Sequence, residues 1–379
     1  MNPVKSITFG LDPSAPPAFL LDWELTKKCN LDCSYCGIGE FGGHDNSTQH
    51  PPLEECVKSI DFMYAYVDLY MQYRKESNRK VVLNVYGGES LVHPQILRIL
   101  ELVREKYQQY KDRWELTVTC TTNGIVGTRM WSKIIPHIDE FIVSYHPENI
   151  PKQKEQYKKN ILQLKQLNKR FKCVMLMHND KKMFNDVENM VQYCKDNNLP
   201  FFLKRLDNSE EQWAYTGKQF QKIQNDFAPD QVEGNSDEKV LSIAKGRACC
   251  GGRKMCVNGD YKKNLKYIEK QGFKDWHCSV NWYFLFVRQY NGKVYSSTKD
   301  CLTSTTTNRV EPLGNINSYQ EMVDTLRTQL ETKAMPVIKC VKTICRCGYC
   351  APKAESREEL NELLKYRINI DVLKYVKSD

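Results

Sequence analysis

Three closely spaced cysteines near the start of the chain have the clearest potential for chemistry. Cys29, Cys33 and Cys36 follow a Cys-x3-Cys-x2-Cys spacing, directly after an apolar segment at residues 19–25. Three thiolates on one short loop can bind three irons of a [4Fe–4S] cluster, whereas a closed cluster needs four ligands. The remaining iron is then an open position where a small molecule can bind and receive an electron. Zinc and buried free thiols are the alternatives, but ribbon-type zinc sites usually pair two Cys-x2-Cys halves, and the next cysteine, Cys56, falls in a predicted helix.

A second short motif, Gly87-Gly88-Glu89, stands at the end of the second predicted strand. Two glycines let the backbone come close to a ligand, because they have no Cβ. The carboxylate of Glu89 can accept a hydrogen bond from a ligand ammonium group. A tight strand exit explains a Gly-Gly pair equally well, so the motif carries weight because it stands one strand–helix unit after the cysteines.

Together these two motifs resemble the radical S-adenosylmethionine (radical SAM) superfamily. In that family SAM binds the open iron through its amino and carboxylate groups, and the Gly-Gly-Glu motif meets the ammonium. The family usually has proline next, whereas this chain has Ser90, which puts only the rigidity of the turn in question. The resemblance implies that SAM is cleaved to methionine and a 5′-deoxyadenosyl radical, which takes a hydrogen atom from the substrate.

The resemblance also implies further SAM contacts. Tyr35, just before the third cysteine, matches an aromatic that packs beside the adenine. Asn123 and Ser144, at the ends of the third and fourth strands, match positions that contact the methionyl or ribose groups. Arg205 or its neighbour Lys204 would pair with the SAM carboxylate. No catalytic residue is assigned beyond the cluster, and three histidines near strand ends receive no role: His44, His93 and His146.

Nine of the sixteen cysteines lie between residues 249 and 350. This group resembles the SPASM and twitch extensions of radical SAM enzymes, which hold auxiliary [4Fe–4S] clusters. Cys278, then an Asn291-Gly292 hairpin signal, then Cys301 follow part of that pattern. A tighter grouping replaces the family's Cys-x2-Cys-x5-Cys-x3-Cys run, so the number of auxiliary clusters, one or two, stays open.

One auxiliary cluster would use the last four cysteines, for which zinc is the alternative: Cys340, Cys345, Cys347 and Cys350. A second would use four earlier cysteines: Cys250, Cys256, Cys278 and Cys301. The four cysteines on predicted strands and helices are interpreted as buried apolar residues: Cys56, Cys120, Cys173 and Cys194.

An alternation of strands and helices positions the N-terminal motifs. Strands are predicted at 20–25, 81–86, 116–121, 141–145, 173–177 and 201–206. Helices are predicted at 53–74, 94–110, 128–136, 152–167 and 185–196. This order favours right-handed β–α–β units and a parallel sheet. Six units are too few for a closed eight-stranded barrel, so we expect an α/β fold with an open (β/α)6 partial TIM barrel, which the resemblance also implies. Chemistry then gathers at the carboxyl ends of the strands.

The predicted division of the chain has five parts. They are an N-terminal extension (1–18), the partial barrel (19–207), a helical bridge or linker (208–246), a cysteine-rich SPASM/twitch-like module (247–352) and a C-terminal helix (353–379).

Composition bounds the class of protein. With 41% hydrophobic and 27% charged residues among 379, the chain is predicted to be a soluble globular protein. It has no apolar run of the ~20 residues needed to span a bilayer and no secretory signal pattern, so we expect a cytoplasmic location without membrane contact. Cysteines in that setting favour metal or redox use over disulfides. The net charge of +9 permits nucleic-acid or acidic-peptide binding but is better explained by a lysine-rich solvated surface.

The predicted function is radical SAM chemistry on a peptidyl or amino-acid-derived substrate, since SPASM-like extensions most often accompany peptide-modifying enzymes. The alternative is modification of a nucleobase or an amino-acid-decorated nucleotide. From another class, the chain could be a non-catalytic iron–sulfur or zinc scaffold, although Gly87-Gly88-Glu89 weighs against it. An electron donor such as flavodoxin or ferredoxin is an expected partner.

Overall fold

The computed structural model describes residues 6–9, 18–36, 44–73, 79–206, 216–219, 255–257, 274–297, 312–332, 338–340 and 353–364. Most of the predicted bridge at 208–246 therefore lies outside the described residues. No helix among the described residues is long and apolar enough to cross a membrane.

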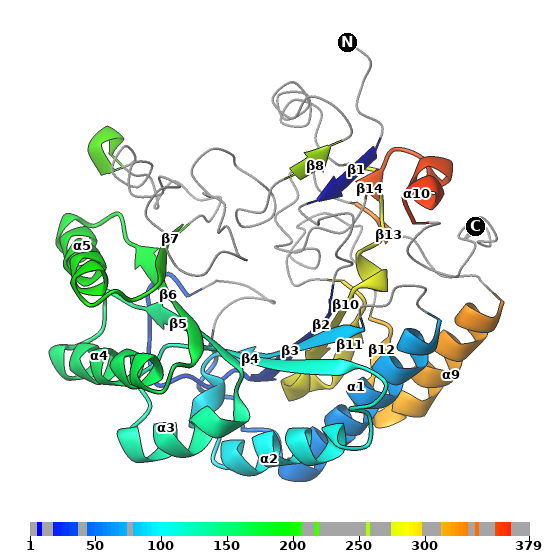
Figure 1. The fold of residues 1–379 in the computed structure, drawn as a ribbon, viewed down its shortest axis with the longest axis horizontal. Helices are drawn as coiled ribbons and strands as arrows, with labels where there is room; N and C mark the ends of the chain where they lie inside the picture. Colours follow the sequence, from blue (N-terminus) through cyan, green and yellow to red (C-terminus); the bar gives the residue numbers. More distant parts are fainter. Residues whose placement is uncertain are drawn as a thin grey trace.

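Six parallel strands alternate with five helices, as the sequence predicts (Figure 1). The elements are β2 (Phe19–Thr26), α1 (Leu53–Gln72), β3 (Lys80–Gly87), α2 (Ile96–Tyr107), β4 (Glu115–Thr122), α3 (Thr128–Ile134), β5 (Glu140–Tyr145), α4 (Pro151–Gln166), β6 (Arg170–Met177), α5 (Lys181–Asp196) and β7 (Phe201–Arg205). Each strand pairs with the next along the chain, and the helices lie along the outer face of the curved sheet. The (β/α)6 partial barrel is confirmed.

Element boundaries differ from the prediction mainly at α5, which begins at Lys181 instead of 185. Asp180 caps this helix, because its carboxylate accepts hydrogen bonds from the N–H groups of Lys182 and Met183. The prediction followed the apolar spacing and missed this cap. The other helices agree within three residues at each end.

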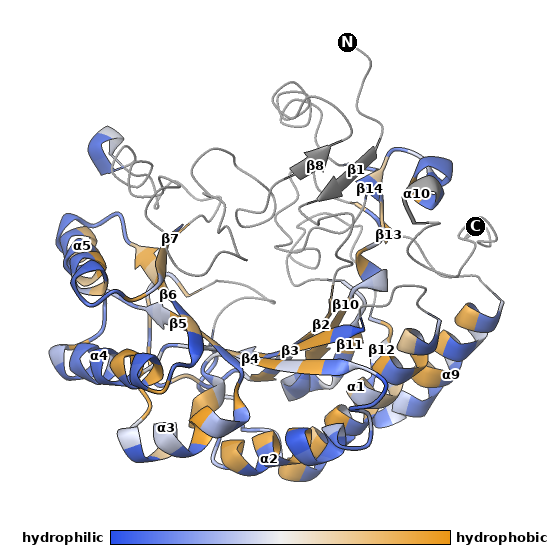
Figure 2. Cartoon of the chain, in the orientation of Figure 1, coloured by the Kyte–Doolittle hydropathy of each residue, from blue (hydrophilic) through white to orange (hydrophobic). Residues whose placement is uncertain are grey.

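The two faces of the sheet have different chemistry. Apolar residues such as Leu21, Trp23 and Val85 are buried against the helices, which carry polar and apolar stripes in Figure 2. The concave face is polar, and there Asn84 donates to the carboxylate of Asp22 at 2.9 Å. The four cysteines predicted to be buried apolar residues are buried in the structure, which confirms that interpretation: Cys56, Cys120, Cys173 and Cys194.

Three strands from the C-terminal part of the chain extend the barrel sheet. They are β10 (Phe284–Arg288), β11 (Lys293–Tyr295) and β12 (Gly314–Asn315), and they give a nine-stranded sheet. The predicted hairpin is confirmed, since Gly292 takes a φ of +67° between β10 and β11. The parallel pairing of β10 with β2 was not predicted, because strands 264 residues apart leave no local signal.

A buried ion pair and a second hydrogen bond link β10 to β2. Arg288 donates through Nε to the Glu24 carboxylate at 2.9 Å, and both side chains are almost fully buried. Trp23 Nε1 donates to Gln289 Oε1, also at 2.9 Å. In addition, α9 (Tyr319–Glu331) packs against α1. The C-terminal part is thereby joined to the first strand of the barrel.

A second, five-stranded sheet combines both ends of the chain. Its order is β13 (Ile338–Lys339), β9 (His277–Cys278), β14 (Lys353–Ala354), β1 (Ser6–Phe9) and β8 (Met255–Val257). A short helix, α10 (Arg357–Leu364), adjoins it. The predicted five-part division stays a prediction, but residues 6–9 pair with C-terminal strands (Figure 1).

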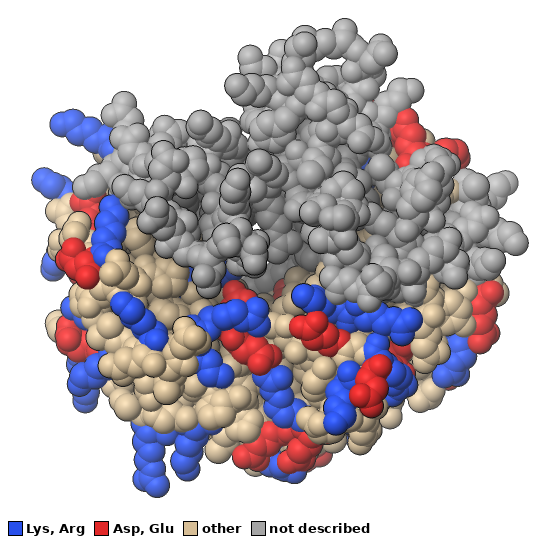
Figure 3. Space-filling model, in the orientation of Figure 1, with Lys and Arg blue, Asp and Glu red and all other residues tan. Residues whose placement is uncertain are grey.

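Charged residues of both signs are interspersed on the face shown in Figure 3. This distribution agrees with a solvated surface on that side of the barrel.

Candidate active site

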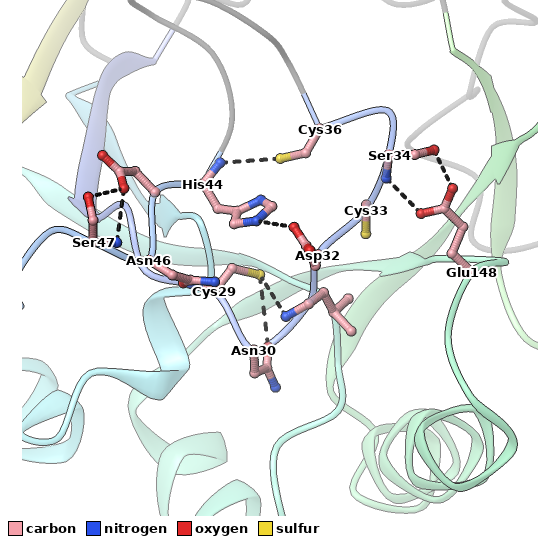
Figure 4. A network of polar contacts seen from close by, with 12 residues as sticks. Cys29, Asn30, Asp32, Cys33, Ser34, Cys36, His44, Asn46, Ser47 and Glu148 are labelled. Atoms are coloured by element: carbon pink, nitrogen blue, oxygen red, sulfur yellow. Dashed lines mark hydrogen bonds and ion pairs between the residues drawn. The ribbon is translucent and has the colours of Figure 1, made fainter.

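The loop that follows β2 carries Cys29, Cys33 and Cys36, all three partly exposed (Figure 4). Each sulfur lies near a nitrogen. The backbone N–H of Leu31 donates to Cys29 Sγ at 3.4 Å, and that of His44 donates to Cys36 Sγ at 3.3 Å. Nδ1 of His146 lies 3.3 Å from Cys33 Sγ. The two backbone N–H donors stabilise negative charge on the sulfurs of Cys29 and Cys36.

Two segments brace this loop from opposite sides. On one side, Asn46 Oδ1 accepts a hydrogen bond from the backbone N–H of Cys29 at 2.9 Å. On the other, Glu148 accepts from both the backbone N–H and the hydroxyl of Ser34. Asp32 and His44 form a further contact of 3.0 Å within the brace (Figure 4). The cysteine loop is therefore held in place by residues from the loops before α1 and after β5.

The donor set fits an iron–sulfur cluster. Burial raises the pKa of Cys29 to about 11 and that of Cys33 to about 12, so these thiols need a metal to ionise at neutral pH. Among the described residues, no three His, Cys, Asp or Glu side chains converge as ligands of a single metal ion would. In a cluster each cysteine binds a different iron, so the three sulfurs need not converge on a single metal ion.

An open cavity of about 530 Å³ adjoins the triad. Its lining combines the cysteine loop with the brace before α1: Cys29, Asn30, Leu31, Asp32, His44, Asp45 and Asn46. The volume is in the range of small-molecule sites.

The glycines of the Gly-Gly-Glu motif lie against the chain itself. The N–H of Gly88 donates to the Thr26 carbonyl and that of Glu89 to the Lys28 carbonyl, each at 2.8 Å. A Cβ on Gly87 would sit 2.2 Å from the Thr26 oxygen, and one on Gly88 would sit 2.4 Å from the Lys27 oxygen. The Gly-Gly pair by itself predicts a close approach to a ligand, whereas in the structure the backbone at Thr26 and Lys27 occupies that space.

Glu89 is buried, with 1% of its surface exposed. Its carboxylate accepts from the N–H of Leu91 at 3.0 Å, the hydroxyl of Thr122 at 2.9 Å and the N–H of Asn123 at 2.6 Å. Burial raises its pKa to about 7 despite these hydrogen bonds. Glu89 therefore holds the turn after β4, and the expected contact with a ligand ammonium stays a prediction.

Two of the other predicted SAM contacts lie beside the triad. Asn123 donates to Asn30 Oδ1 at 2.7 Å, and its Nδ2 lies 3.9 Å from Cys29 Sγ. The hydroxyl of Tyr35 lies 2.9 Å from Nδ1 of His146. Ser144 lies on β5, on the face opposite the buried Val143. The side chain of Arg205, at the end of β7, lies outside the described residues.

Sequence reasoning missed three residues of this site. The sequence pattern assigns no role to His146 and does not point to Asn46 or Glu148. The position of His146 directly after β5 was the available signal, because the carboxyl ends of parallel strands meet at one edge. Burial lowers the pKa of His146 to about 4.

Most predicted auxiliary ligands lie outside the described residues: Cys250, Cys301, Cys345, Cys347, Cys350 and the side chain of Cys256. Cys278 is buried in β9, where it pairs with Ile338 of β13. Cys340 follows β13, and its N–H donates to the carbonyl of Trp276. This register puts Cys278 and Cys340 on the same face of neighbouring chain segments, although the sequence predicts them in two different ligand sets.

Comparisons with known proteins agree with this architecture. Residues 23–202 match the family described as "Radical SAM superfamily". The solved structure of a histidine-tagged form of anSMEcpe "with bound AdoMet" is similar with a TM-score of 0.50 at 14% identity, covering 93% of each chain. "Native anSMEcpe with bound AdoMet and Kp18Cys peptide" scores 0.49 at 15% identity, covering 93% of this chain and 97% of that one. Comparison with curated proteins gives no significant match.

The family match spans the barrel from β2 into β7 and includes both the cysteine triad and the Gly-Gly-Glu motif. The likeness to anSMEcpe, at its low identity, concerns the fold alone. Residues 23–202 are accordingly a radical SAM domain, and the protein is an enzyme of the radical SAM superfamily.

Proposed function

We propose that Cys29, Cys33 and Cys36 hold an open [4Fe–4S] cluster and that the enzyme cleaves SAM there. The observation that carries this proposal is the triad itself: three sulfurs on one braced loop, each beside a nitrogen, at the carboxyl edge of the sheet. When bound, the cluster supplies the electron that splits SAM into methionine and a 5′-deoxyadenosyl radical.

The chain's own residues would bind and orient SAM beside the triad. Tyr35 and Asn123 already lie at the cysteine loop, and Ser144 and Arg205 stand at the ends of β5 and β7. The role proposed for Gly87-Gly88-Glu89 is contact with the SAM ammonium. The support for it is the position of the motif against the backbone of the cysteine loop.

For the substrate, we propose a peptidyl or amino-acid-derived molecule. The support is the SPASM-like pattern of cysteines and hairpin in the C-terminal part. The cysteines there would hold one or two auxiliary clusters, and the shared face of Cys278 and Cys340 favours a set that includes both. A nucleotide substrate is the alternative, and flavodoxin or ferredoxin is the proposed electron donor.

Anaerobic reconstitution with iron, sulfide, SAM and dithionite tests the first proposal. Wild-type protein should release 5′-deoxyadenosine, and Cys29→Ala, Cys33→Ala and Cys36→Ala should each abolish it. Cys56→Ala is the matched control, since that thiol is buried in α1 and should not affect cleavage. Cleavage that persists in the triple variant of the triad would overturn the assignment.

A further inference from the structure

Among the described residues, His146 makes the one side-chain contact from the β5 end of the barrel to a sulfur of the triad, and no role has been given to it. Its Nδ1 lies 3.3 Å from Cys33 Sγ and 2.9 Å from the Tyr35 hydroxyl. The Tyr35 hydroxyl is also within hydrogen-bonding reach of Cys33. One ring nitrogen, one hydroxyl and one sulfur thus form a closed triangle.

Counting protons in this triangle limits the possible arrangements. A Cys33 thiolate bound to iron has no proton, so it can only accept hydrogen bonds. If Nδ1 also lacked a proton, its lone pair would face the thiolate at 3.3 Å, which is repulsive. We assign a proton to Nδ1 on this argument, as in one neutral tautomer and in the imidazolium. The other neutral tautomer, in which Tyr35 donates to Nδ1, would give Cys33 no hydrogen bond from His146.

That proton can stabilise the sulfur by two routes. Nδ1–H can donate directly to Cys33, or it can donate to Tyr35 Oη while the hydroxyl of Tyr35 donates to Cys33. In both cases the sulfur gains one donated hydrogen bond, and in both the donor chain begins at His146.

The surroundings keep the two rings in this position. The His146 and Tyr35 rings are stacked, with centroids 5.9 Å apart and planes 6° from parallel. Tyr35 also makes an edge-to-face contact with His178, with centroids 5.8 Å apart. Glu148, two residues after His146, binds Ser34, the residue between Cys33 and Tyr35.

We propose that His146 is a positioning residue that donates through Nδ1 to the Cys33–Tyr35 pair and so raises the reduction potential of the cluster at the triad. Hydrogen bonds to ligand sulfurs stabilise the added negative charge of the reduced state, which shifts the potential upward. The inference rests on the proposed function, because it takes Cys33 as a cluster ligand.

The decisive measurement is the midpoint potential of the N-terminal cluster. It is determined by reductive titration with dithionite, monitored by EPR, in the absence of SAM. The protein used would retain the triad but lack Cys278 and Cys340, so that the EPR signals of any auxiliary clusters are weakened. His146→Phe keeps a ring that can stack on Tyr35 but removes the donor, so its potential should be lower than that of the parent. His146→Asn restores an amide donor near the same position and should recover part of the difference.

His178→Phe is the matched control. This histidine also packs against the Tyr35 ring, but its Nε2 lies 3.6 Å from the Glu148 carboxylate, so the substitution changes a ring beside Tyr35 without removing the Nδ1 donor of His146. It should leave the potential at the parent value. Equal potentials in His146→Phe and the parent would overturn the inference, and so would an equal decrease in His178→Phe. A parent that binds no cluster at the triad would instead overturn the proposed function.

A second readout uses cluster-free protein. It tests the inference even if a His146 variant fails to take up iron. Nδ1 of His146 contacts the Cys33 sulfur, whereas Cys29 and Cys36 contact backbone N–H groups. His146→Phe keeps a ring at this position but removes the Nδ1–H donor that stabilises the thiolate, so alkylation of Cys33 should slow relative to the other two, as mass spectrometry of the modified peptides would measure. Unchanged relative rates would contradict the contact on which the inference depends.

Discussion

The Glu89 carboxylate accepts a 2.6 Å hydrogen bond from the backbone N–H of Asn123 and thereby joins the ends of β3 and β4. Asn123 in turn donates to Asn30 on the cysteine loop. The Gly-Gly-Glu motif thus reaches the cysteine triad in two ways, through its backbone at Gly88 and Glu89 and through this side-chain relay. One buried acid therefore links three consecutive strand ends.

Replacing Glu89 by alanine should weaken both folding and SAM binding. The N–H of Asn123 and the hydroxyl of Thr122 would lose their buried acceptor, at a cost of about 1–3 kcal/mol each in unfolding free energy. SAM affinity should fall by ~1.5–3 kcal/mol, the scale of a hydrogen bond to a charged group. Urea unfolding and calorimetric SAM titration measure the two effects. Glu89→Gln keeps one acceptor oxygen and should lose less stability, and equal stability of the alanine variant and the wild type would contradict this account.

The same acid should make stability depend on pH. Burial raises the pKa of Glu89 from 4.5 to about 7, so between these values the folded protein holds a proton that the unfolded chain has released. Stability from this group is therefore present at low pH and is lost as the pH rises toward 7, by at most about 3 kcal/mol. Cluster-free wild type should lose stability relative to Glu89→Gln between pH 4.5 and pH 7, measured by urea unfolding. A constant difference across that range would show that the carboxyl group is not perturbed.

Gly88→Ala should be strongly destabilising because the new Cβ would lie 2.4 Å from the Lys27 carbonyl oxygen. The strand exit or the cysteine loop must then shift, and forced packing of this kind typically costs about 1–3 kcal/mol. Gly127→Ala is the control, since its Cβ would meet nothing within 4 Å. Thermal unfolding of both variants, with their iron content after reconstitution, separates the steric effect from a general loss of glycine. Similar melting temperatures for the two variants would count against the close approach.

A variant without the N-terminal triad should still bind iron and sulfide if the C-terminal cysteines hold auxiliary clusters. We expect about four irons for one cluster and about eight for two. Because ligand binding adds to folding free energy, loss of Cys340 should also lower stability. Elemental analysis decides the matter, and stoichiometric zinc without iron in the triad-deleted protein would contradict the auxiliary clusters while leaving the radical SAM domain intact.

The sequence by itself determined the repeating part of the fold and the identity of the central motif. Strands β2 to β7 and the helices between them follow from local hydrophobic periodicity, which needs no distant contact. The triad was recognisable because its three ligands lie within eight consecutive residues, Cys29 to Cys36. Chain order then predicted that the Gly-Gly-Glu motif would reach the same edge of the sheet.

Only the tertiary structure decided which residues surround that motif. His146 meets Cys33 across 113 residues of sequence, and Glu148 meets Ser34 across 114. The pairing of β10 with β2 and the shared face of Cys278 and Cys340 likewise join segments that are distant in the chain. Local pattern fixes which face of a strand or helix is apolar, whereas the partner of a polar side chain depends on where the complete fold brings a second chain segment.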